Sequence, residues 1–199
     1  MEWEMVMKLM PAAVMAAALV AGAARAQAPA GLPPAAVSLA ASPAIDQWNV
    51  FGTGESHRVM ADATVAGGYA FAVKVAGAGQ NPWDVQAGVI TVLPIHAGDT
   101  VLLALWARPL AQPPGASAIA IHADIQQAQA PYTPIAGQDL SVSGGWKLYY
   151  VSGVSSLDLQ AGEAAATVQL ATGQQEIALG PVFVLDFGQG YDLARLPVN

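Results

Sequence analysis

The amino-acid sequence predicts an all-β protein in which antiparallel strands stack as a sandwich or close as a barrel. Short segments with alternating apolar and small or polar residues recur after residue 36, as expected of strands with one buried face. Gly and Pro turn signals separate these segments, and helical periodicity is nearly absent from the same part of the chain. About ten short strands at regular spacing are typical of such all-β domains.

The segment 69–75, "YAFAVKV", alternates between large apolar side chains and alanine or lysine, which predicts a half-buried strand. Pro181 lies within the last apolar run and predicts a β-bulge or an edge position there, because proline cannot donate a hydrogen bond to a strand ladder. The other predicted strands cover residues 84–94, 100–108, 116–126, 139–143, 146–154, 164–171 and 176–188.

Residues 1–28 are predicted to be a signal peptide, with Met7 as an alternative start. Lys8 precedes an apolar run, and the small residues that end this run fit a small-x-small cleavage pattern. An N-terminal membrane anchor is the alternative, but roughly 16 apolar residues are few against the ~20 that span a bilayer. We therefore expect an exported protein, secreted or periplasmic and free of the membrane after cleavage. A Pro/Ala-rich linker over 29–36 would precede one domain over 37–199.

Composition excludes several classes of partner. The formal net charge is −7 and no basic cluster is present, which argues against nucleic acid. An acidic surface is not attracted to anionic lipid either. The chain has no cysteine, so neither a disulfide framework nor a thiolate metal site can form.

Several segments, taken in order, are similar to one known family. The segments are "NPWDVQ", "LPIHAGDTVLLALWAR", "APYTP", "GGWKLYYVSG" and "EIALGPVFVLDFG". Together they resemble the jelly-roll carbohydrate-binding modules of families 4, 9 and 22, over most of residues 37–190. The resemblance implies a jelly-roll sandwich that binds a plant-type or other polysaccharide or oligosaccharide on a concave sheet. Such modules are commonly fused to a glycoside hydrolase. For a module that stands alone, the resemblance implies separately encoded glycoside hydrolases as partners.

Two positions depart from the pattern of the family. Val101 or Leu102 stands where an aromatic residue is usual after the Gly turn, and Asp186-Phe187 stands where Asp-Asn is usual. The resemblance implies no organic cofactor. It does suggest a structural calcium ion. Because Asp186-Phe187 departs from the family pattern, the ligands of this ion are unknown, and the presence of calcium stays open at this point.

The strand around Trp106 carries the first candidate binding residues. An indole face can cover the apolar C–H patch of a sugar ring, while charged and polar side chains bond the hydroxyls at its rim. If the strand 116–126 lies beside 100–108, then His122 and Asp124 share a face with Trp106 and Arg108. The alternative is an Arg108–Asp124 ion pair that only covers the tryptophan.

Three further residues extend the candidate site. The resemblance assigns ligand contact to Gln86 and Arg108 with most weight, and to Trp83, Trp106 and His122 as well. Tyr132 lies between two prolines in "APYTP", where a rigid, exposed loop would close one end of a groove. Plain loop packing is the alternative for Tyr132.

No catalytic residue is predicted. The three histidines have no metal-binding spacing, and no G-x-S-x-G motif is present. A glycosidase needs two carboxyl groups across a cleft, and Glu55 with Asp84 or Asp124 is the pair that the sequence leaves open. The sequence therefore predicts a non-catalytic binder. The alternatives are a glycoside hydrolase or lyase on the same scaffold, and a structural or adhesion subunit of the cell surface.

Overall fold

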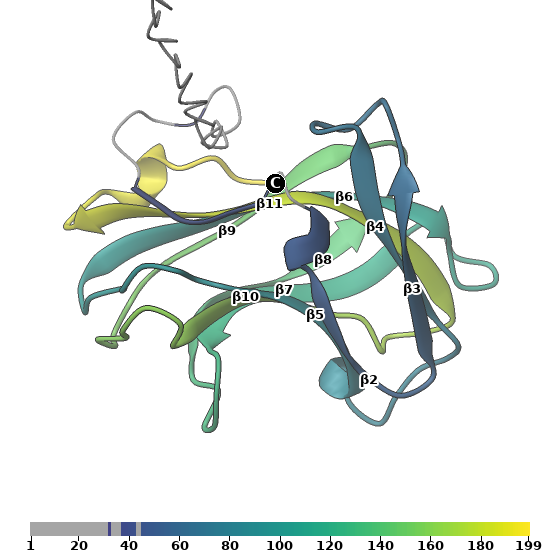
Figure 1. The fold of residues 1–199 in the computed structure, drawn as a ribbon, viewed down its shortest axis with the longest axis horizontal. Helices are drawn as coiled ribbons and strands as arrows, with labels where there is room; N and C mark the ends of the chain where they lie inside the picture. Colours follow the sequence, from purple (N-terminus) through teal and green to yellow (C-terminus); the bar gives the residue numbers. More distant parts are fainter. Residues whose placement is uncertain (1–31, 33–36, 43–44) are drawn as a thin grey trace, which may run out of the picture.

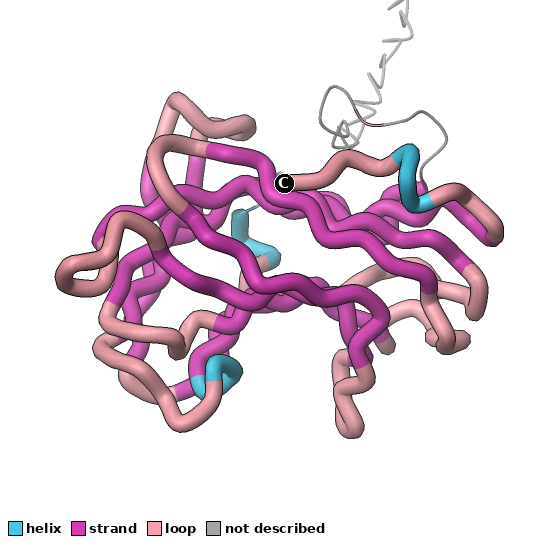
Figure 2. Tube along the Cα trace, turned by 180° about the vertical axis from the view of Figure 1, so that it is seen from behind, coloured by secondary structure: helices cyan, strands magenta, loops and turns pink. Residues whose placement is uncertain are grey.

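The computed structural model describes residues 32, 37–42 and 45–199. The expected signal peptide lies outside the described residues, and so does the expected linker apart from Leu32. Strands dominate the described part, and helix is confined to three one-turn 3-10 helices (Figure 2). No helix among the described residues has the length and hydropathy that a membrane span requires.

The fold is an all-β antiparallel sandwich of the jelly-roll type, seen as two stacked layers in Figure 1. One sheet has six strands in the order β3-β4-β11-β6-β9, with β1 also paired to β11, and the other has five in the order β2-β5-β10-β7-β8. The strands are β1 (Val37–Ser42), β2 (Asn49–Gly52), β3 (Glu55–Ala61), β4 (Tyr69–Val75), β5 (Val85–Ile90), β6 (Asp99–Ala111), β7 (Ile119–Gln127), β8 (Pro134–Val142), β9 (Lys147–Val154), β10 (Ala164–Gln169) and β11 (Gln175–Gln189). The short helices are η1 (Ile45–Gln47), η2 (Pro82–Asp84) and η3 (Leu193–Arg195).

The strands that were predicted from alternation are present, with their ends shifted by a few residues. β8 begins five residues earlier than the predicted 139–143, and β1, β2 and β3 were not predicted as strands. The bulge expected at Pro181 is confirmed, because the register between β11 and β6 shifts between Leu179 and Val182. A shift in register accommodates the proline, which cannot donate a hydrogen bond to the ladder.

The main core lies between the two sheets and consists of alternate residues of nearly every strand. In β7 the residues Ile119, Ile121, Ala123 and Ile125 are buried in it. Because successive side chains in a strand point to opposite faces, this core commits the intervening residues of β7 to the outer face of the five-stranded sheet.

The outer face of the six-stranded sheet is largely covered by other parts of the chain. Leu196 of the C-terminal segment packs on Leu102, Ala104, Phe183 and Leu185. The side chain of Asn199 bonds both the N–H and the C=O of Tyr150 in β9, at 2.9 and 2.8 Å. The chain end thus lies against this sheet (Figure 1).

Close approach of β8 and β9 closes one side of the sandwich. A Cβ atom added at Gly153 would lie 2.8 Å from the Cβ of Ala136 and 2.9 Å from the carbonyl oxygen of Ile135. Glycine is therefore required at this position by space alone, because the obstructing atoms include backbone.

We expect Gly153→Ala to destabilise the fold by about 1–3 kcal/mol, the usual cost of forcing extra atoms into a packed site. Thermal or urea denaturation measures the change. Gly145→Ala is the matched control, since no atom lies within 4 Å of a Cβ added there. Equal stability of the two variants would show that β8 and β9 are not packed this closely.

Candidate functional site

The outer face of the five-stranded sheet carries a continuous row of large and polar side chains. The row runs across all five strands through successive register partners: Phe51, Gln86, Gln169, His122 and Asp139. Five strands at the usual spacing span roughly 19 Å, which is long enough for several sugar rings. The row exists because the alternate residues of the same strands are held in the core.

A groove of about 740 Å³ lies over this face, within the usual size range of ligand sites. The sides of the groove are formed by η2 and by the loop after β7. Both segments project from the five-stranded sheet and lie below it in Figure 1. The lining residues are Phe51, Trp83, Gln86, Gln126, Ala128, Pro131 and Tyr132.

Trp83 is presented to the groove by η2 and is 58% exposed. Asp84 stabilises this turn by accepting a hydrogen bond from the backbone N–H of Asn81 at 3.0 Å. That bond is the main reason why the pKa of Asp84 lies below its usual range. Gly52 packs directly on the turn, and its φ of +120° together with the nearby backbone of Asp84 leaves no room for a Cβ.

Tyr132 is presented by the loop between β7 and β8 and is 55% exposed. Its φ of 57° is uncommon for a residue with a side chain. Backbone hydrogen bonds hold the loop, from Tyr132 N–H to Gln129 and from Ala128 N–H to Glu163, both 2.9 Å. The tyrosine is exposed, as expected, and it lines the groove.

Asp124 lies beneath the polar row and is only 2% exposed. It accepts hydrogen bonds from the Thr167 hydroxyl and from Nε2 of Gln169, the latter at 3.1 Å. Burial raises the pKa of Asp124 above its usual value, because the carboxylate loses contact with water. Its position indicates that Asp124 orients the Gln169 amide rather than contacting a ligand itself.

His122 lies between two carboxylates on the same face. Its Nδ1 is 2.7 Å from Oδ1 of Asp139, and its Nε2 is 3.7 Å from Oδ2 of Asp124. Asp139 belongs to the edge strand β8 and its side chain is 94% exposed. This end of the row is therefore charged, whereas the end at Phe51 and Trp83 is aromatic.

The expected neighbourhood of Trp106 and Arg108 with His122 and Asp124 is wrong. Strands β6 and β7 follow one another in sequence but belong to different sheets, so their outer faces point away from each other. The expected Arg108–Asp124 pair is wrong for the same reason. Alternation along each strand correctly indicates which residues share a face of that strand, but it does not indicate which sheet the strand joins.

Trp106 and Arg108 instead fix a loop on the back of the six-stranded sheet. Asp62, at the start of that loop, accepts hydrogen bonds from Arg108 at 2.9 Å and from the indole of Trp146 at 3.0 Å. The hydroxyl and backbone N–H of Thr64 also bond Asp62, and these contacts lower its pKa to about 2. Trp106 packs with Val65 of the same loop.

Four residues of the face were not predicted. Gln126 follows Asp124 at the two-residue spacing of a strand, and Gln169 follows Thr167 in the same way within an alanine-rich strand, so this spacing was the available signal. Asp139 is the register partner of His122, and such pairing is not visible in the sequence. Phe51 lies in a four-residue strand too short to show alternation.

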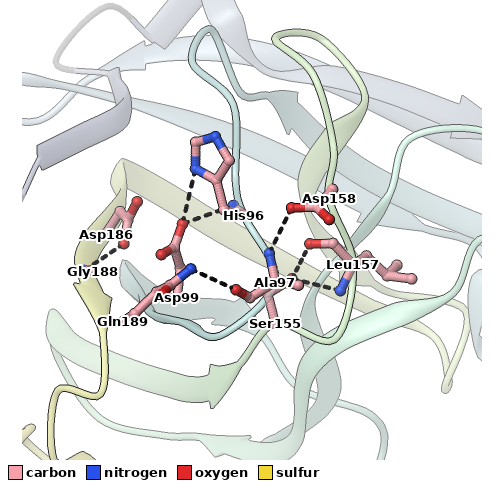
Figure 3. A network of polar contacts seen from close by, with 9 residues as sticks. All are labelled: His96, Ala97, Asp99, Ser155, Leu157, Asp158, Asp186, Gly188 and Gln189. Atoms are coloured by element: carbon pink, nitrogen blue, oxygen red, sulfur yellow. Dashed lines mark hydrogen bonds and ion pairs between the residues drawn. The ribbon is translucent and has the colours of Figure 1, made fainter.

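Two carboxylates at the end of β11 and the start of β6 accept hydrogen bonds from nearby backbone N–H groups (Figure 3). Asp186 accepts a hydrogen bond from Gly188 N–H at 2.7 Å, and Asp99 accepts one from His96 N–H at 2.7 Å. Burial and the neighbouring Asp99 carboxylate raise the pKa of Asp186. Among the described residues no group of three or more His, Asp or Glu side chains is arranged to hold a metal.

The carboxylate pairs that the sequence left open for hydrolysis are not assembled across the groove. Glu55 is on β3 of the six-stranded sheet and lies 3.0 Å from Nδ1 of His57. Asp84 is engaged by Asn81, and Asp124 is buried beneath the row. Their positions give no acid and nucleophile facing one bound sugar.

Comparison with solved structures finds the same fold in known proteins. The xylan-binding CBM22-1 domain of Xyn10C from Paenibacillus barcinonensis aligns with a TM-score of 0.52 at 11% identity, covering 78% of this chain and 98% of that one. The second N-terminal cellulose-binding domain of Cellulomonas fimi β-1,4-glucanase C aligns at 0.50 with 20% identity, covering 77% and 92%. A CBM4 module aligns at 0.50 with 16% identity, covering 70% and 90%.

The chain thus has the fold of the jelly-roll carbohydrate-binding modules, and the resemblance expected from its sequence is confirmed at the level of the fold. No protein-family model matches the chain, and no curated protein matches it.

We expect Trp106→Ala to lower the free energy of unfolding by about 2–4 kcal/mol, somewhat less than truncation of a fully buried aromatic residue. Retention on a polysaccharide should not change, because Trp106 lies on the sheet that does not form the groove. Denaturation and affinity electrophoresis measure the two effects. If Trp106→Ala folds but is no longer retained on the polysaccharide, Trp106 belongs to the binding site after all.

The ionised form of Asp62 should stabilise the fold above about pH 4 and lose this effect as the pH falls towards 2. The reason is that its folded pKa of about 2 lies below the value of about 3.9 in an unfolded chain. Wild type and Asp62→Asn are compared by thermal denaturation from pH 7 to pH 2. Their difference in Tm should be largest near neutral pH and shrink below pH 4. A difference that is constant over this range would contradict the assignment.

Proposed function

We propose that this protein binds a polysaccharide or oligosaccharide in the groove of the five-stranded sheet and does not transform it. One observation carries the proposal. Two exposed aromatic side chains, Trp83 and Tyr132, line one groove from separate segments, together with the amide groups of Gln86 and Gln126. Aromatic faces cover the apolar side of a pyranose ring, while glutamine and histidine exchange hydrogen bonds with its hydroxyls.

The names of the solved structures support the same chemistry. One aligned domain is described as xylan-binding and another as cellulose-binding, and both polymers are plant cell-wall glycans. We therefore propose a plant-type β-linked polysaccharide as the first ligand to test. Two aromatic contacts and a few hydrogen bonds support about 4–8 kcal/mol of binding free energy, or millimolar to micromolar dissociation constants.

The absence of catalysis is part of the proposal. Among the described carboxylates of this side of the sandwich, Asp124 is buried and Asp84 is bonded within its own segment. Asp139 is exposed but pairs with His122 rather than with a second carboxyl group across the groove. An adhesion surface for protein is less well supported, since such an interface is depleted of charged groups at its centre.

We also propose that the chain is exported to the periplasm or the medium, with separately encoded glycoside hydrolases as partners. The apolar run that follows Lys8 supports export, because it has the length and flanks of a signal peptide. A polysaccharide ligand would be met outside the cytoplasm, where the hydrolases that degrade it also act.

Trp83→Ala and Tyr132→Ala should each weaken retention on a bound polysaccharide by about tenfold, as expected for loss of one stacking contact of about 1.4 kcal/mol. Affinity electrophoresis against xylan, β-glucan, mannan and hydroxyethyl cellulose identifies the ligand. Tyr69→Ala is the matched control, because Tyr69 is also 55% exposed but belongs to the six-stranded sheet.

Two results would contradict the proposal. If no polysaccharide retards the wild type, the protein does not bind these glycans. If Trp83→Ala and Tyr132→Ala lose no more retention than Tyr69→Ala does, the glycan does not bind in the groove. A reducing-end assay with the same polysaccharides tests the absence of catalysis, because only an enzyme releases new chain ends.

A further inference from the structure

The positive charges of the described residues are segregated on one side of the sandwich. Four of them belong to strands of the six-stranded sheet and one to η3: Arg58, Lys74, Arg108, Lys147 and Arg195. Neither the five-stranded sheet nor the two segments beside the groove contribute a lysine or arginine in the described part of the chain. The groove therefore lacks the side chains that bind carboxylate, sulfate and phosphate groups.

Most of these cationic side chains also contact a carboxylate or an aromatic ring nearby. Arg58 lies 2.6 Å from Glu176, and Arg108 lies 2.9 Å from Asp62. The Arg195 guanidinium is stacked 5.0 Å from the ring centre of Tyr191. These contacts hold them on the six-stranded sheet or on the chain end that covers it, not at the groove.

The five-stranded sheet carries carboxylates instead. Asp139 projects from β8 into water, and Asp124 lies beneath the row in β7. His122 is the one group in the row that can become positive, and both of its ring nitrogens face a carboxylate, at 2.7 and 3.7 Å. The His122 imidazole is thus paired with carboxylates rather than free to meet an anionic ligand.

We infer that the outer face of the five-stranded sheet, which carries this groove, selects glycans by charge: it accepts uncharged chains and repels chains that carry carboxylate, sulfate or phosphate groups, with Asp139, at the far end of the polar row from Phe51, as a determinant of that selection. The inference rests on the proposed function, since it concerns which glycans enter the same groove. Repulsion acts over about 8 Å at physiological ionic strength, so a ligand charge within one or two sugar rings of Asp139 experiences it.

Two pairs of polymers test the inference: hydroxyethyl against carboxymethyl cellulose, and arabinoxylan against glucuronoxylan. For wild type at low salt, we expect the dissociation constant of the charged polymer to be about three- to tenfold higher than that of the uncharged polymer of the same pair. The ratio should shrink in 0.5 M NaCl, because salt screens the repulsion. It should also shrink in Asp139→Asn and fall further in Asp139→Lys.

Asp158→Asn is the matched control. Asp158 lies in the loop after β9, where it accepts a hydrogen bond from Ala97 N–H at 3.0 Å that an asparagine oxygen can also accept (Figure 3). The control should leave the ratio of the two dissociation constants unchanged, although it removes the same charge from the protein.

The outcomes separate this inference from the function on which it rests. Equal or tighter binding of the charged polymers, or a ratio that neither salt nor position 139 alters, overturns charge selection while glycan binding stands. Absence of binding to all four polymers, together with the failure of the mannan and β-glucan gels, overturns both.

Discussion

The two-residue period of the strands in the five-stranded sheet is the constraint on which the rest of the structure depends. Ile121 and Ala123 must fill the core, so His122 and Asp124 must face outward. A slip of one residue in β7 would bury the imidazole and carboxylate and expose the isoleucines, which makes the register strongly specified. The same register aligns Gln86 and Gln169 with His122 across neighbouring strands. The polar row is therefore a consequence of how the core is packed.

The two outer faces of the sandwich differ in what covers them. On the six-stranded sheet, the loop anchored by Asp62 and the segment around Leu196 pack against the strands, and Trp106 is partly enclosed. On the five-stranded sheet, the projecting segments lie beside the face rather than on it, and Trp83 stays largely exposed. Both faces contain tryptophan and a carboxylate, so residue types alone do not distinguish a ligand surface from a structural cluster. The covering segments do.

The sequence predicted the fold class and most strands because alternation and turn residues are local signals. It also predicted the exposed position of Tyr132, since two nearby prolines restrict that loop. It did not predict the site as a whole, because the partner of each strand depends on contacts far apart in the chain. β7 lies between β8 and β10, and β10 follows more than thirty residues later, whereas β6, which precedes β7 directly, belongs to the other sheet. The predicted cluster around Trp106 combined correct local faces with a wrong pairing of strands.

Asp124 shows how a buried carboxylate can order the polar row above it without being exposed itself. Asp124 is almost fully buried, and an unpaired carboxylate there would be costly. Bonds from Thr167 and Gln169 offset that cost, and in return the Gln169 amide is held in one orientation. A fixed amide loses little conformational entropy when it bonds a sugar hydroxyl, which matters for a site with few contacts. Asp139, in contrast, remains in water, where its charge acts on what approaches the sheet rather than on what holds it together.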